Sequence, residues 1–479
     1  MVPFGSMDDS SGRDAREWAY EEFGHAELGD ARRTARLVRM TASLAARPGG
    51  RVLEVFRSSA EQQAAYDFLS NEKVRSEDLL AAVRSATVRR CADESWVHVV
   101  VDGTSLRLTD WKREKGFGGV GSTQLGASGL KVIHAYAVSP QGVPLGVLNQ
   151  QWWIRARRKK RIDCQSRPLE DKETRHWVDA IRDATLALTA GGSKAWFQVD
   201  REGDRYWTLK ALRDSGEWFT VRSTYAHRFV YAGNLRRLQR LRDVARKGKV
   251  RGTVELELRE RVHRTARTAR VVIRTTSVVL YTKESYSDER MAVPLNVVDV
   301  KEVGTPPRGE KALHWRLLTN HGIVTREDVD GILHGYVQRW KIEELHRVWK
   351  SGACCVEQSQ LRSAERVIKW AILAVVTAAR IERLRMLARA KPDAPASLEF
   401  NDYELRALVL MKRKYAKKTE SIPDDIPTIA DAIRWIAQLG GHAGHASSGR
   451  PGSVTLRRGL EFITPVAIAL ELLENENKL

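Results

Sequence analysis

One stretch of the sequence places four chemically useful side chains at helical spacing. Tyr336, Arg339, Glu343 and Lys350 follow one another at intervals of three, four and seven residues. At about 100° per residue they would all point within roughly a sixth of a turn on one helix face. A carboxylate among cations and a phenol suits a metal site that also holds a phosphate backbone. The alternative is an ion-paired, solvated helix surface.

Two aspartates follow apolar runs that are typical of buried strands. Asp102 ends WVHVVVD, and Asp200 comes directly after AWFQV. Enzymes built on sheets place polar groups at strand ends beside their sites, although Asp–Gly is also a common turn signal. With Glu343 these aspartates make three carboxylates, a set that can hold two Mg²⁺ or Mn²⁺ ions about 3.5–4 Å apart. Asp204 is expected to support that site or to cap a helix.

The spaced tyrosine, arginine, glutamate and lysine match a known signature. The segment YVQRWKIEELHRVWK fits the Y-x2-R-x3-E-x6-K pattern of bacterial DDE transposases. The chain resembles the insertion-sequence-four family, and within it the Tn5-type cut-and-paste transposases. The resemblance extends over nearly the whole chain, through LGDARRTARLV, VDGTS, QQWW, VDREGD, FTVRS and HWRLLT.

The resemblance implies a ribonuclease-H-like catalytic fold and a complete transposition reaction. Asp102, Asp200 and Glu343 would be the catalytic, metal-binding triad, with two Mg²⁺ or Mn²⁺ ions per active site. Excision would pass through a DNA hairpin with a base flipped out of the stack. The partners would be transposon-end DNA with its terminal inverted repeats, target DNA, and a second copy of the chain. Each subunit of this homodimer would cut the end bound chiefly by the other.

The resemblance also implies a set of DNA contacts. Tyr336, Arg339 and Lys350 would grip phosphates near the cut. Trp315 lies in HWRLLT, where the family places its stacking tryptophan, and stacking a flipped base on an indole contributes about 1–3 kcal/mol. The alternative for Trp315 is a core position. Arg222, at the end of a strand, would contact DNA or form a surface ion pair.

The charge balance points to the same class of partner. The chain has 479 residues, with 80 Lys and Arg against 60 Asp and Glu, a net charge of +20. Such a protein should be drawn to polyanions, nucleic acid first and anionic membranes second. Residues 222–274 hold 16 Lys and Arg against four Asp and Glu, or 16 − 4 = +12. This segment either lines a nucleic-acid channel or is a solvated basic face.

Around these residues the pattern predicts three regions. Residues 1–90 form a helical domain that binds the DNA end, with Arg32, Arg33 and Arg36 on a face that touches phosphates or is simply solvated. Residues 91–365 form the α/β, ribonuclease-H-like mixed-sheet catalytic domain in β-β-β-α-β-α-β order, with a basic β-rich insertion at 222–318. Residues 366–479 form a helical domain that the resemblance assigns to dimerisation.

Several function classes are disfavoured by the sequence. Its hydrophobic content of 42% excludes wholesale disorder, and its four cysteines include no C-x-x-C pair of a structural zinc site. No signal peptide is visible, and the most apolar run, WAILAVVTAA, is too short to span a bilayer. A cytoplasmic, nucleoid-associated bacterial protein without a membrane partner is expected. A metal-dependent nuclease and a catalytically silent DNA-binding regulator stay open, as does the role of the basic run 155–161.

Overall fold

The computed structural model describes most of the chain. The described residues are 15–121, 126–155, 168–225, 227–232, 238–258, 260, 265–283, 289–416, 422, 425–444 and 449–476. Apart from Arg155, the basic run 155–161 lies outside them. No helix in these ranges is both long enough and apolar enough to cross a membrane.

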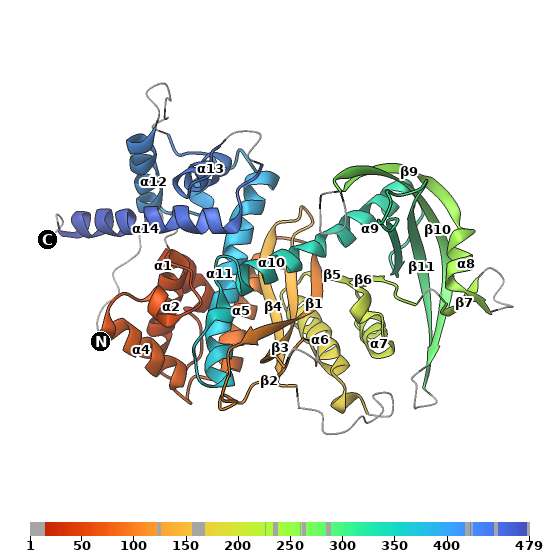
Figure 1. Cartoon of the computed structure of the whole chain (residues 1–479), viewed down its shortest axis with the longest axis horizontal. Coiled ribbons are helices and arrows are strands. Elements are labelled where there is room, and N and C mark those ends of the chain that lie inside the picture. Colours follow the sequence, from red (N-terminus) through yellow and green to blue (C-terminus); the bar gives the residue numbers. More distant parts are fainter. Residues whose placement is uncertain are drawn as a thin grey trace.

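A mixed sheet of twelve strands forms the centre of the described structure (Figure 1). The strands are β1 (Trp96–Leu108), β2 (Gly118–Gly119), β3 (Ser128–Val138), β4 (Pro144–Trp153), β5 (Lys194–Val199), β6 (Trp218–Arg222), β7 (Phe229–Ala232), β8 (Leu238–Arg240), β9 (Lys249–Leu258), β10 (Arg267–Lys283), β11 (Arg290–Glu302) and β12 (His314–Thr319). Their order is β2-β3-β1-β5-β6-β12-β11-β10-β7-β8, with β4 paired to β3 and β9 to β10. β5 is parallel to both β1 and β6, whereas β3 and β12 run antiparallel to their neighbours. This arrangement confirms the mixed α/β fold and is consistent with a ribonuclease-H-like core.

Helices cover both faces of the sheet and form the two ends of the chain. The N-terminal helices are α1 (Ala15–Phe23), α2 (Ala31–Ala46), α3 (Val52–Val55), α4 (Ser59–Ser70) and α5 (Ser76–Cys91). The central ones are α6 (Thr174–Ala190), α7 (Tyr206–Asp214), α8 (Leu241–Arg246), α9 (Arg326–Gln338), α10 (Trp340–Lys350) and α11 (Ala364–Ala390). The C-terminal ones are α12 (Asp402–Tyr415), α13 (Ile429–Leu439) and α14 (Ser453–Glu476). Figure 1 shows the N- and C-terminal helices on one side of the molecule and the β9–β11 insertion on the other.

The two faces of β1 enter two different hydrophobic cores. Val99 and Val101 pack with α6 on one face, whereas Val100 and Leu106 pack with the N-terminal helices, α10 and α11 on the other. Successive side chains of a strand point to opposite faces, so Asp102 shares the face of Val100 and points toward α10. The N-terminal helices therefore share one core with the face of the sheet that carries this aspartate.

The insertion predicted at 222–318 is β-rich. It contains β7–β11 and the short helix α8, and returns to the central sheet through β12, which pairs with both β11 and β6. Along β10, Ala269, Val271 and Ile273 are buried, whereas Arg270 is exposed and Arg274 half-buried. This alternation places arginines on the outer side of the insertion.

Two local expectations were wrong, and each bears on the site. The strand that was expected to stop at Asp102 continues to Leu108, because residues 103–108 keep their antiparallel pairing with β3. The single helix expected to carry Tyr336 to Lys350 is divided into α9 and α10 at Arg339, although Arg339 itself keeps helical torsion angles. Asp102 thus lies inside a strand, and Arg339 lies at a junction between helices.

Candidate active site

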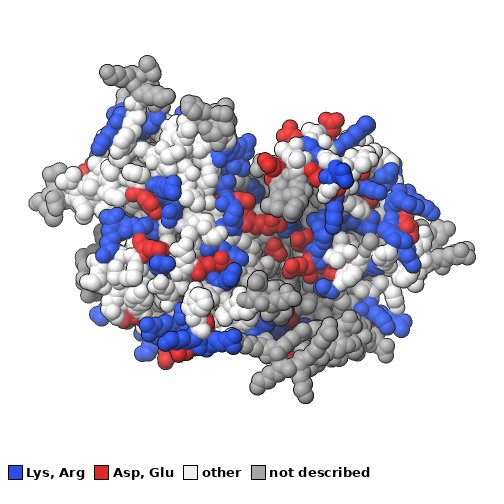
Figure 2. Space-filling view, in the orientation of Figure 1, with Lys and Arg blue, Asp and Glu red and all other residues white. Residues whose placement is uncertain are grey.

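Three carboxylates from β1, the end of β5 and α10 come together where the parallel pairing of β1 and β5 stops. Val101 pairs with Val199 in the parallel register of β1 and β5, so the next residues, Asp102 and Asp200, lie side by side. Glu343 is in the first turn of α10, which packs on β1. Figure 2 shows acidic side chains gathered in a hollow at the centre of this face, with Lys and Arg side chains on both sides.

Arg339 joins the three carboxylates. Its Nη2 donates a hydrogen bond to Glu343 Oε1 at 2.6 Å, and its Nη1 lies 3.7 Å from Asp200 Oδ2 and 3.8 Å from Asp102 Oδ2. The arginine side chain is 2% exposed, whereas that of Glu343 is 39% exposed. One buried guanidinium therefore neutralises part of the charge that three carboxylates bring to one place.

Burial and charge shift the pKa values of two groups in the site. Burial raises the pKa of Asp102 to about 7, against the opposing effects of the Arg339 charge and a 2.8 Å hydrogen bond from the Gly103 amide. Burial, together with the charge of Asp200, raises the pKa of Tyr336 to about 12. Asp102 thus holds a proton more readily than an ordinary aspartate, and Tyr336 stays neutral.

The donor set fits the divalent ions that the sequence predicts. Three carboxylates supply the hard oxygen ligands that Mg²⁺ or Mn²⁺ prefers, and Asp200 Oδ1 is buried with no hydrogen-bond partner among the described residues. In the described ranges, however, no group of three or more His, Cys, Asp or Glu side chains is arranged to share a metal ion. Arg339 lies between the carboxylates instead, so ions would bind there only if this guanidinium gave up its present contacts.

Tyr336, Trp315 and Lys350 lie around the three carboxylates. The Tyr336 ring is buried, and its hydroxyl, beside Arg222, makes no well-formed hydrogen bond with any described residue. Trp315 is half-buried and meets Tyr336 edge to face, with ring centroids 5.7 Å apart. Lys350 Nζ contacts Thr104 Oγ1 at 3.3 Å, two residues along β1 from Asp102.

Arg222 lies close to this group, and the N-terminal arginines do not. Arg222 donates a hydrogen bond to the His314 carbonyl at 3.2 Å, and its charge acts on the Tyr336 hydroxyl. Arg32, Arg33 and Arg36 are on α2, in the N-terminal helical region. Arg33 donates to the Leu28 carbonyl at 2.7 Å, Arg32 is exposed, and Arg36 is half-buried.

Asp204 holds together two segments beside the site. Its side chain is fully buried, pairs with Arg228 at 2.6 Å, and accepts a hydrogen bond from the Thr224 amide at 2.8 Å. It does not cap a helix, because α7 begins after Arg205. Asp204 therefore ties the start of the insertion to the segment that follows Asp200.

A pair of buried histidines behind the triad was not found from the sequence. His134 lies opposite Asp102 in the β1–β3 pairing, and its Nδ1 is 3.1 Å from Nε2 of His346 on α10. Both rings pack against Trp349. The sequence offers no signal for this pair, because the register that places His134 opposite Asp102 is not visible in the sequence alone. The pair connects α10 to the sheet directly beneath Glu343.

These histidines should make the fold sensitive to acid. Burial lowers the pKa of His134 and of His98 to about 3, and that of His346 well below its ordinary 6.5. Below pH 6.5 these histidines take up protons in the unfolded chain and not in the folded one, so their contribution to stability is complete above pH 6.5 and falls as the pH drops. The raised pKa of Asp102 acts in the opposite direction below pH 7 and offsets part of this loss. Between pH 6.5 and 5 each histidine should remove about 2 kcal/mol.

Urea unfolding at pH 7.5 and pH 5 measures this effect. We expect a clearly lower midpoint at pH 5, and a smaller drop for His134→Gln. The exposed His25 is the matched control, and His25→Gln should keep the full drop. An equal pH dependence in His134→Gln and the unaltered protein would contradict the assignment of buried, neutral histidines.

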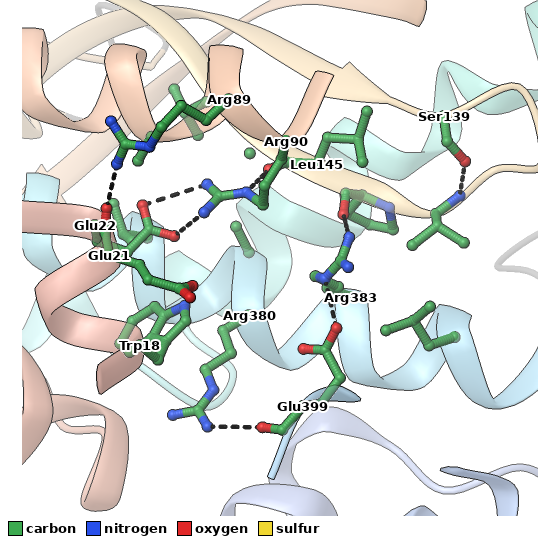
Figure 3. Close-up of a pocket in the computed structure, with 18 of the residues that line it drawn as sticks. Trp18, Glu21, Glu22, Arg89, Arg90, Ser139, Leu145, Arg380, Arg383 and Glu399 are labelled. Carbon is green, nitrogen blue, oxygen red and sulfur yellow. Dashed lines mark hydrogen bonds and ion pairs between the residues drawn. The ribbon is translucent and has the colours of Figure 1, made fainter. Parts of the chain in front are cut away.

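A separate cavity of about 440 Å³ lies between α1, α5, the β3–β4 hairpin and α11. None of the three carboxylates lines it. Figure 3 shows Arg90 pointing toward Glu22, and Arg383 toward Glu399; the closest contacts are 2.6 Å and 2.9 Å. These ion pairs join α1 to α5 and α11 to the segment that follows it, and the same two arginines donate hydrogen bonds to the Leu145 and Pro144 carbonyls of β4.

Two protein-family models match the N-terminal and the C-terminal regions of the chain. Residues 15–74 match the family model for transposase DNA-binding, and residues 376–471 match the model for the transposase Tn5 dimerisation domain. These matches support a Tn5-like DNA transposase. The first includes Arg32, Arg33 and Arg36, and the second begins within α11. Asp102, Asp200 and Glu343 lie between the matched segments, so their role rests on geometry and on the signature in the sequence.

Proposed function

We propose that the chain is a cut-and-paste DNA transposase of the insertion-sequence-four type, with Asp102, Asp200 and Glu343 as its catalytic residues. The observation that carries this proposal is the convergence of the three carboxylates on one face, in a chain whose two ends match DNA-binding and dimerisation domains. Two Mg²⁺ or Mn²⁺ ions, when bound, would activate the attacking oxygen and stabilise the leaving oxygen.

The reaction would be a series of in-line phosphoryl transfers at a single site. A water molecule nicks one strand at the transposon end, and the freed 3′-hydroxyl attacks the opposite strand to form a hairpin. A second water opens the hairpin, and the 3′-hydroxyl then joins target DNA. The same three carboxylates can serve each step, because each step exchanges one oxygen for another on a phosphate.

The surrounding side chains fit these substrates. Lys350 lies near the carboxylates with its side chain 26% exposed, where it can reach a phosphate. Trp315 is half-buried against Tyr336, so one side of the indole can accept a flipped base. The buried Tyr336 hydroxyl and Arg339 would reach DNA only after a local rearrangement of the site.

A strand-transfer assay separates this proposal from a simple nuclease. The probe is a pre-cut DNA end from the gene's native flank, carrying a 3′-hydroxyl and a 5′ label, with a supercoiled plasmid as target. Joined, labelled plasmid supports the transposase. Efficient nicking of the uncut end without any joined product would favour the nuclease, and binding without either reaction would favour the regulator.

The basic insertion should contribute binding energy that does not depend on DNA sequence. Arg240, Arg246, Lys247 and Lys249 are exposed and lie on or beside α8. Replacing all four with Gln should weaken binding to any duplex. The slope of log K against log salt should become shallower by about 0.9 for each phosphate that the variant no longer neutralises. Affinity measured at several salt concentrations gives this slope.

A second variant, which loses four positive charges on the other side of the molecule, controls for the change in net charge. Arg175, Arg182, Lys210 and Arg213 lie on α6 and α7, away from the face that carries α10. Their replacement with Gln should leave the slope nearly unchanged. If DNA binding weakens equally in both quadruple variants, the insertion has no special role and its charge is merely solvated.

A further inference from the structure

The catalytic strand continues beyond Asp102 into an exposed arm. We call residues 107–117, which connect β1 to β2, the β1–β2 arm. Its base is fixed, because Leu108 and Phe117 are buried in the core that also contains the N-terminal helices. Its tip carries Trp111, which at 92% exposed is the most exposed large hydrophobic side chain in the described ranges.

The tip is held in a defined turn. Asp110 Oδ1 accepts a hydrogen bond from the Glu114 amide at 3.0 Å, and the Asp110 carbonyl accepts one from the Arg113 amide at 3.3 Å. Arg113 has a φ of 59°, a left-handed conformation that is unusual for a bulky residue. The turn therefore presents Trp111 to solvent at the expense of local backbone strain, instead of folding the indole back onto the core.

Glu357 links the base of the arm to Lys350 on α10. Lys350 and the Arg107 amide both contact the carboxylate of Glu357, at 3.6 Å and 2.8 Å. The Arg107 side chain is exposed, as are those of Lys112 and Arg113 at the tip. The strand between Asp102 and Leu108 rises by about 20 Å, the length of about six base pairs of duplex.

We propose that the β1–β2 arm is a DNA-binding element, in which Trp111 packs against the sugar and base edges of duplex close to the cut and the flanking cations hold its phosphates. This inference rests on the proposed function and names a further contact of the same site. Exposed aromatic side chains beside Lys and Arg are typical of nucleic-acid surfaces, whereas the centres of protein interfaces are depleted in Lys. Two carboxylates accompany these cations, Asp110, whose Oδ1 accepts a hydrogen bond from the Glu114 amide, and the exposed Glu114 itself. With four Lys and Arg against two Asp and Glu, the arm keeps a net charge of 4 − 2 = +2.

Fluorescence quenching of the full-length protein tests whether DNA covers Trp111. Acrylamide should quench an accessible part of the tryptophan emission, and saturating DNA that carries the gene's end with its flank should protect that part. Trp111→Phe should lack the protected emission. Trp218→Phe, which alters another exposed tryptophan at the start of β6, should keep it.

Affinity for the same DNA gives a second measurement. Trp111→Ala should bind at least about fivefold more weakly, and Trp111→Phe should stay within about twofold of the unaltered protein. Because Trp111 lies outside the core, circular dichroism should show unchanged folding. Equal affinity in Trp111→Ala, or a Trp111 emission that stays quenchable in the DNA complex, would overturn the proposal.

The two proposals can fail separately. If the unaltered protein cuts the DNA while Trp111 stays accessible, the arm is not a DNA contact and the proposed function stands. If DNA protects Trp111 but is never cut, the arm stands and the catalytic proposal fails. If Trp111 becomes covered at high protein concentration without DNA, and DNA adds nothing, the arm is a contact between copies of the chain and the DNA proposal is overturned.

Discussion

Replacing Glu343 with Gln should abolish DNA cutting and leave DNA binding intact. The amide keeps the shape of the side chain but removes the negative charge that a divalent ion requires, and such a ligand contributes several kcal/mol of transition-state stabilisation. We therefore expect cleavage to slow by about 10³-fold or more. Because the Glu343 side chain is 39% exposed, its replacement should change the stability of the fold little.

The neighbouring residue on the same helix provides a matched control. Glu344 is also a partly exposed glutamate of α10, but it pairs with Arg347 at 2.8 Å and Arg385 at 3.6 Å instead of with Arg339. Glu344→Gln removes the same charge from the same helix and should cut DNA at nearly the normal rate. If Glu343→Gln and Glu344→Gln behave alike, Glu343 has no special place in the chemistry.

Replacing Arg339 with Gln should lower the melting temperature of the protein and increase the stabilisation that Mg²⁺ provides. The substitution leaves three carboxylates close together without their shared cation, and breaking such a buried ion pair costs about 3 kcal/mol. We expect a lower melting temperature in the absence of divalent ions. Adding Mg²⁺ should then raise the melting temperature of the variant more than that of the unaltered protein, because the ion takes over the role of the guanidinium.

Arg347 supplies the control for this measurement. It is on the same helix and forms its ion pair with Glu344 at 2.8 Å on the protein surface. Arg347→Gln should therefore melt normally and show the ordinary response to Mg²⁺. A Mg²⁺ response in Arg339→Gln no larger than that of the unaltered protein would mean that the three carboxylates do not bind the ion together.

The sequence indicates which carboxylates come together, but it does not give the extent of the strand that carries Asp102. Asp200 follows a short buried strand and Glu343 lies on an amphipathic helix, and both features depend on local patterns. The extension of β1 past Asp102 depends on pairing with β3, whose paired residues lie twenty to thirty residues away along the chain. Asp102 and Gly103 together form a common turn signal, so the local pattern gave the wrong end for that strand.

The position of Arg339 shows a second limit of sequence patterns. Helical spacing gives the direction in which a side chain points, but it does not give the depth at which the helix lies in the fold. The signature predicted an arginine that grips phosphates, and the structure places it 2% exposed between three carboxylates. Val337 shows the converse. Helical spacing turns it away from the side of Tyr336 and Glu343, toward the apolar residues of the helix, yet its side chain is 46% exposed.

The central claim is that Asp102, Asp200 and Glu343 form one active site that cuts DNA. The most direct test incubates the protein and Mg²⁺ with a plasmid that carries its gene and native flanking DNA, and resolves the products on a denaturing gel. Cleavage at the transposon ends and a hairpin species should appear with the unaltered protein and with Glu344→Gln. Both should be absent with Asp102→Asn, Asp200→Asn and Glu343→Gln, although all three variants bind the ends. Cleavage by any of these three at the normal rate would contradict the claim.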